Sequence, residues 1–178
     1  ATAATRWAGR LDRHHRHGNA LMAYGFTRTE LLDAVVSALV AASTGAGARV
    51  YKSRTSAIAA EAGAYPVILV WNGGSSDANI LDACTTPAEW NKTSTFACQA
   101  LVVLNGTATD AAVDAALDTL EEQVRSVLQG AVSWSSGLDM FEQLESVSAS
   151  YGQPQSASDG KGASVTLTFT VTHGVLYG

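Results

Sequence analysis

Residues 94–105 read STFACQALVVLN, and this stretch decides the fold. Apolar residues fall on both sides of the strand that it predicts, with Phe96 and Cys98 on one side and Leu101 and Val103 on the other. A strand that is apolar on both sides is normally an interior strand of a sheet that helices cover on at least one face. We therefore expect the rest of the chain to supply neighbouring strands and covering helices.

An amphipathic helix is predicted directly after this strand. Asn105-Gly106 ends the strand, and Thr107 stands three residues before Asp110 in the spacing of a capping box. Residues that then recur at steps of three and four predict one buried stripe, formed by Val113, Leu117, Leu120, Val124 and Leu128.

A second helix is predicted near the start of the chain. Thr27 and Glu30 have capping-box spacing, and Phe26 and Leu31 have the spacing of a hydrophobic staple. The apolar residues of this helix are Leu32, Val35, Val36, Leu39 and Val40.

Four further strands complete the expected sheet. They cover residues 48–54, 65–71, 144–151 and 164–172, with a bulge expected at Leu144–Glu145. We expect long loops at 72–92 and 152–163. The prediction is an α+β fold with a mainly antiparallel sheet of four to five strands, two helices packed on one face, and the order α-β-β-β-α-β-β.

Charge divides the chain into a basic arm, residues 1–25, and a single acidic domain, residues 26–178. The whole chain of 178 residues has a formal net charge of −5. Residues 1–28 hold five arginines against Asp12 alone, whereas the remaining residues hold six Lys or Arg and fifteen Asp or Glu. A cationic arm on an acidic body suggests contact with an acidic surface, with nucleic acid or with a neighbouring copy. Two cysteines without a disulfide framework suggest a protein kept in a reducing cytoplasm.

The sequence offers little chemistry. It has no phosphate-binding glycine loop and no nucleophile elbow, and a catalytic triad would depend on His173, the one histidine of the acidic domain. The only metal-like cluster, His14, His15 and His17 beside Asp12, has no fixed geometry. No apolar run has the length of a membrane span. We expect a protein that is not an enzyme and that has no cofactor, metal or membrane contact.

A pattern of acidic residues on one predicted helix has two interpretations. Asp110, Asp114, Asp118 and Glu122 recur every four residues on the helix after the organising strand, and like charges at this spacing repel. We name these four residues the acidic row. It is either a solvated outer face or a surface that meets a basic partner or lines an acidic passage.

The order of these elements resembles that of a known family. A capped Leu/Val helix is followed by RVYKSR (49–54), YPVILVW (65–71), the organising strand, a helix with LDTLEEQV (117–124) and the pair LESVSASY (144–151) and SVTLTFTVTH (164–173). This resembles the tail terminator (minor tail protein U-like) family of long-tailed bacteriophages and gene transfer agents. The resemblance covers about residues 26–173, and the basic arm departs from the family's compact start.

The resemblance implies a structural virion protein that is assembled in the host cytoplasm. Such a protein forms a ring, usually a hexamer, at the head-proximal end of the tail tube. It stops tube polymerisation and joins the tail to the head-completion or connector protein, and DNA passes through it without sequence-specific binding. Two alternatives stay open: another head–tail connector or tail-completion protein of the neck, and a nucleic-acid-binding module that uses the basic arm.

Candidate contact residues follow from charge and position. The sheet edges are expected at 48–54 and 144–151, and the docking loops at 72–92 and 152–163. The interface candidates are Arg6, Arg10, Arg13, Arg16, Arg49, Lys52, Arg54 and Trp90, and the acidic row supplies the candidates for a channel lining.

Overall fold

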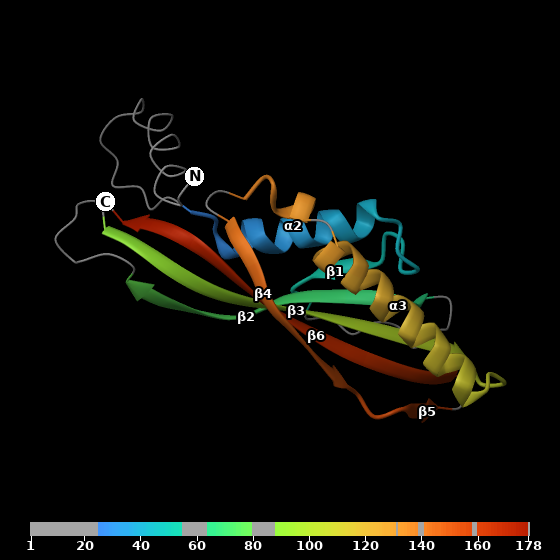
Figure 1. Ribbon diagram of the computed structural model, residues 1–178. Helices are drawn as coiled ribbons and strands as arrows, with labels where there is room; N and C mark the ends of the chain where they lie inside the picture. Colours follow the sequence, from blue (N-terminus) through green and yellow to red (C-terminus); the bar gives the residue numbers. More distant parts are fainter. Residues whose placement is uncertain are drawn as a thin grey trace.

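The protein folds as one mixed β-sheet with two helices on one of its faces (Figure 1). The computed structural model describes residues 25–54, 64–79, 88–130, 132–138, 141–157 and 160–177. Its elements in chain order are α2 (Arg28–Ala41), β1 (Val50–Lys52), β2 (Val67–Asn79), β3 (Ala88–Asn105), α3 (Asp110–Gly130), the 3-10 helix η2 (Val132–Ser135), β4 (Phe141–Tyr151), β5 (Gln155–Ala157) and β6 (Gly160–Tyr177).

The strands lie in the order β1-β2-β3-β6-β4, and the short strand β5 pairs with β6 beyond the end of β4. β1 runs parallel to β2, whereas the other described pairs are antiparallel. The α+β class and the two helices are therefore confirmed, but the sheet is mixed. The sequence order also gains η2 and β5, which the predicted α-β-β-β-α-β-β order lacked.

The hydrophobic core lies between the sheet and the two helices. β2, β3 and β6 turn alternate side chains toward the helices, and the central pair is Phe96 on β3 stacked on Phe169 of β6, with ring centroids 5.0 Å apart. All five residues of the predicted α3 stripe are buried. In α2 the buried residues are Leu31, Leu32, Val35 and Leu39, but Val40 is 39% exposed. Both organising predictions, the interior strand and its covering helix, are confirmed.

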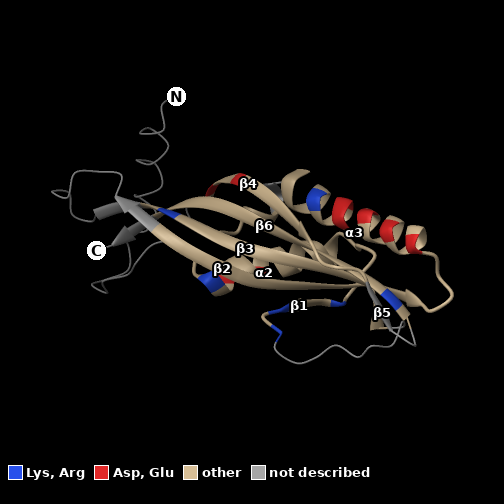
Figure 2. Ribbon diagram, turned by 90° about the horizontal axis from the view of Figure 1, so that it is seen from below, with Lys and Arg blue, Asp and Glu red and all other residues tan. Residues whose placement is uncertain are grey.

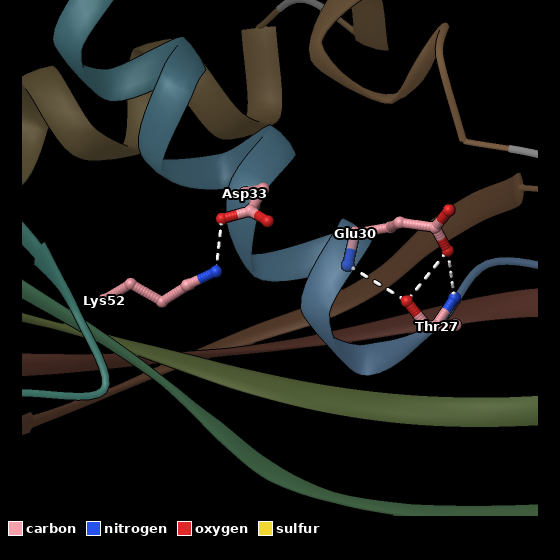
Figure 3. Close-up of polar contacts among 4 residues, drawn as sticks. All are labelled: Thr27, Glu30, Asp33 and Lys52. Carbon is pink, nitrogen blue, oxygen red and sulfur yellow. Dashed lines mark hydrogen bonds and ion pairs between the residues drawn. The ribbon is translucent and has the colours of Figure 1, made fainter.

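The predicted start of α2 is confirmed and that of α3 is wrong. Glu30 N–H donates to Thr27 Oγ1 over 3.2 Å, and Thr27 N–H donates to Glu30 Oε2 over 2.6 Å, which completes a capping box (Figure 3). At α3 the capping oxygen belongs to Thr109, whose Oγ1 accepts from Ala112 N–H over 3.2 Å. Thr107 instead donates to the side chain of Asn105, because its hydroxyl lies within reach of that nearer acceptor.

Most of the predicted loop at 72–92 is strand. β2 continues to Asn79 and β3 begins at Ala88, and residues 72–79 pair with residues 90–96 of β3. Residues 80–87 lie outside the described residues. A bulge between Asn72 and Gly74 lets β2 continue, and Gly74 has a φ of +133°, which favours glycine. Long-range pairing therefore overrides the turn-forming residues here.

The C-terminal hairpin is longer than expected. β4 has register shifts between Phe141 and Gln143 and between Leu144 and Ser146, so the predicted bulge at 144–145 is confirmed. The predicted loop at 152–163 is wrong in part, since it contains β5 and the start of β6. Polar residues there pair because β6 extends past β4 and offers them a strand partner.

Candidate assembly interface

The two edges of the sheet are β1 and β4. Each has a described strand on one side only, β2 beside β1 and β6 beside β4. β1 lies within the predicted edge 48–54, and β4 contains the predicted edge 144–151 and begins three residues before it. Both predictions of an edge position are therefore confirmed. α2 packs over the β1 side of the sheet, and α3 packs over β3 and β6 next to β4. Each edge therefore has its own helix beside it.

The β1 edge carries three of the interface candidates. Arg49 Nε donates to the carbonyl oxygen of Pro66 over 2.9 Å. Lys52 Nζ lies 2.5 Å from Asp33 Oδ1 of α2 (Figure 3). The Arg54 guanidinium lies 4.5 Å from the ring centroid of Tyr51. The three cations thus come together at one edge, each positioned by a contact within the chain.

The β4 edge has two different halves. Its first half, up to Ser146, is bulged and contains Glu142 and Glu145. Its second half, Ser146–Tyr151, pairs with β6 without a register shift and has no charged residue and no proline. Apart from the half-buried Val147, the side chains of this second half are exposed. Exposed sheet edges are usually blocked by charges, prolines or bulges, and these devices are present only in the first half.

The acidic row lies on the outer face of α3. All four residues are exposed, and they form a line along the helix (Figure 2). Asp110 Oδ1 accepts a hydrogen bond from Lys161 Nζ of β6 over 2.8 Å. In the same view, blue residues lie at β1 and red ones on β4 and α3. The described part of the domain is therefore positive at the β1 edge and negative at the β4 edge.

A further carboxylate, Glu121, links α3 to the end of β4. It is buried, and its Oε1 accepts from Arg125 Nε over 2.8 Å while its Oε2 accepts from the Tyr151 hydroxyl over 3.1 Å. The hydrogen bond to this carboxylate, and its negative charge, raise the pKa of Tyr151. Arg125 lies four residues after Glu121, a spacing at which helix side chains pair, whereas Tyr151 is 30 residues away and gives no local signal in the sequence.

His173 belongs to the core. Its Nε2 lies 3.1 Å from Ser94 Oγ, and its ring packs against Phe26 with centroids 3.9 Å apart. Ser94 and His173 are both buried. The contact joins β3, β6 and the residue before the α2 cap.

Several candidates lie outside the described residues. These are Arg6, Arg10, Arg13 and Arg16 of the arm, the histidines beside them and the side chain of Trp90. Within the described ranges, no group of three or more His, Cys, Asp or Glu side chains is placed to hold a metal ion. Neither α2 nor α3 has the length and apolar character that crossing a membrane would require.

Comparison with known proteins gives no family assignment: no family model matches the chain, and the search of curated proteins gives no match.

Proposed function

We propose that this protein is a tail terminator, a structural virion protein that forms a closed ring, a hexamer in the usual family form, at the head-proximal end of a phage tail tube. In that position it stops polymerisation of the tube and joins the tail to the head-completion or connector protein. The proposal rests on the family resemblance of residues 26–173 and on one structural observation, the opposite charge of the two sheet edges.

That observation favours association of identical subunits in a head-to-tail manner. A contact between unlike surfaces of identical subunits leaves one surface of each kind open on every new subunit, so the assembly continues until it closes. The positive β1 edge and the negative β4 edge are such a pair of unlike surfaces. Two like edges would instead favour a twofold dimer.

The ring is proposed to contact three partners besides itself: the tube protein, the connector protein and the passing DNA. The docking loops are shorter than predicted, since much of residues 72–92 and part of 152–163 is strand. The extended ends of β2, β3 and β6, which replace these loops, are the proposed contact surfaces for the tube or the connector.

The test is the position of the chain in intact particles. Imaging with a label on this protein should place one ring per particle between the tube and the head. A label at the distal tip, or repeated along the tube, would refute the terminator function. Placement in the neck on the head side of the tube end would favour the connector or tail-completion alternative.

A separate mass measurement of the purified chain, with and without tube protein, tests the closed ring itself. A single oligomer of fixed size is expected once a tube end is present. If the chain bound nucleic acid and formed no oligomer, the nucleic-acid-binding alternative would replace the proposal.

A further inference from the structure

The second half of β4 is an open strand edge at the surface. Ser146–Tyr151 pairs with β6 on one side, and no described strand covers the other side. The backbone groups that point away from β6 must find partners in water or in another chain. Because the side chains there are small or uncharged, nothing on this segment repels a further strand.

The opposite edge, β1, offers a matching set of backbone groups. Ile68 N–H donates to the carbonyl of Arg49, and Ser53 N–H donates to the carbonyl of Val70. The backbone groups of Arg49 and Ser53 therefore face β2, and alternation along the strand turns those of Val50 and Lys52 outward.

The strand register places these two edges at the same level of the sheet. Tyr51 is paired with Leu69, Leu69 with Gln99, Gln99 with Thr166, and Thr166 with Ser150. The rows on either side lead in the same way from Val50 to Tyr151 and from Lys52 to Ala149. β1 is therefore level with the unblocked half of β4 and runs antiparallel to it.

In a closed ring, this register would place β1 of one subunit beside β4 of the next. Strands of neighbouring subunits remain side by side only if the rotation axis runs close to the strand direction, and rotation in a closed ring has no rise along its axis. Both the level and the direction of β1 are then preserved in the next subunit. We propose that β1 of one subunit pairs antiparallel with Ser148–Tyr151 of the neighbouring β4, so that the sheet continues around the ring; this inference rests on the proposed ring.

Charge favours this occupant over another strand. In the inferred register Arg54 comes opposite Val147, close to Glu145, and Arg49 comes opposite Gly152, at the end of β4. The C-terminal end of the incoming β1 thus carries a cation near a carboxylate of the acceptor. A β4 edge would gain no such match from a second β4, which carries the same acidic residues.

Side-chain alternation gives a sharp test. Tyr51 and Ser150 lie in one row, on the sheet face away from the helices, whereas Ala149 belongs to the neighbouring row and points to the other face. In a Cys84→Ser background of the full chain, the pair Tyr51→Cys and Ser150→Cys should crosslink between subunits on oxidation. The matched pair Tyr51→Cys and Ala149→Cys should not. The pair Tyr51→Cys and Ser148→Cys tests the register in which strand tilt shifts the contact by two residues, because Ser148 lies on the same face as Ser150.

The expected result on a denaturing gel without reductant is a ladder of covalent oligomers that ends at the subunit number of the ring. The ladder should appear with Ser150→Cys or Ser148→Cys and be lost with Ala149→Cys. The two edges lie at opposite ends of the sheet, so a crosslink within one chain cannot imitate this result.

The failures of the two proposals are distinct. An oligomer of fixed size that forms no ladder with either serine position refutes the β1–β4 contact and leaves the terminator ring in place. Equal crosslinking at Ser150 and Ala149 also refutes strand pairing, because two edges that are merely close together would not distinguish side chains on opposite faces of the sheet. A crosslink from Ser150→Cys to the tube or connector protein assigns the edge to that partner. Absence of any oligomer in particles refutes the ring and, with it, this inference.

Discussion

Replacing Asp114 by lysine should stabilise the protein while changing the charge of the acidic row. Asp114 lies between Asp110 and Asp118 at spacings of four residues, and all three are exposed on α3. Asp114→Lys converts two repulsive pairs into two attractive ones, each change being worth about 0.4–1 kcal/mol before the less favourable Lys-to-Asp order is counted. We expect the free energy of unfolding to rise by about 1 kcal/mol, and the melting temperature by about 2–4 °C for a chain of this length.

The assay is urea and thermal unfolding at low ionic strength, with Asp114→Asn as the matched control. The asparagine variant removes the two repulsions without adding attractions, so about half the gain is expected. At 1 M salt the Debye length falls to about 3 Å, and most of the difference from the natural protein should disappear. A lysine variant no more stable than the natural protein at low salt would refute the interpretation that the row is a set of repelling charges.

The same row then tests whether α3 faces the channel of the proposed ring. With lysine at Asp114, Asp118 and Glu122, a channel lining would gain affinity for DNA phosphates through counterion release. Particles carrying this ring should release DNA more slowly, most of all at low ionic strength. Normal release from such particles would assign the row to the outer wall, where it serves solubility.

Four further predictions concern the folded domain. Thr27→Ala should lower the free energy of unfolding by about 1 kcal/mol, measured by urea unfolding, because it removes the α2 cap. The hydrogen bond from the backbone N–H of Thr27 lowers the pKa of Glu30. The stability that the Glu30 carboxylate provides is therefore present above its unfolded pKa and lost as the pH falls below about 4. A difference in free energy of unfolding between the natural protein and Glu30→Gln that stays constant down to pH 2 would contradict this. Gly160→Ala should destabilise by about 1–3 kcal/mol in the same assay, since a Cβ there would lie 2.7 Å from a backbone oxygen of β3, whereas Gly137→Ala, with no atom within 4 Å, should be neutral. Burial raises the pKa of the Cys98 thiol, so thiol reagents should label Cys98 only after unfolding. Rapid labelling of the native Cys84→Ser variant, in which Cys98 is the remaining cysteine, would show that β3 is not interior.

The sequence predicted the features that depend on local periodicity. The α3 stripe and the apolar faces of β3 are repeated patterns, and each repeat requires a core on one side. The capping box at Thr27 and Glu30 is equally local, because both partners lie within one turn.

Features set by long-range pairing were missed. Asn72–Asn79 is rich in glycine, serine and asparagine, which favour turns, and it becomes strand only because β3 lies beside it. The parallel sense of β1 depends on the path of residues 53–66, which no periodicity describes. For the interface, both edges were predicted by position, but the contact of Tyr151 with Glu121 depends on the packing of α3 over β6, the strand next to β4.

The shortness of β1 has a consequence for when the proposed ring can exist. A strand of three residues supplies few backbone hydrogen bonds, and each net bond contributes only about 0.5–1.5 kcal/mol, so one subunit joining one other is held weakly. The last subunit to join makes two contacts at once, and its second contact is intramolecular, with the gain in effective concentration that this brings. We expect such subunits to remain monomeric at ordinary concentration and to assemble cooperatively once a template holds several of them side by side. The short edge strand would thus make each contact too weak for the ring to form without the end of a tail tube as a template.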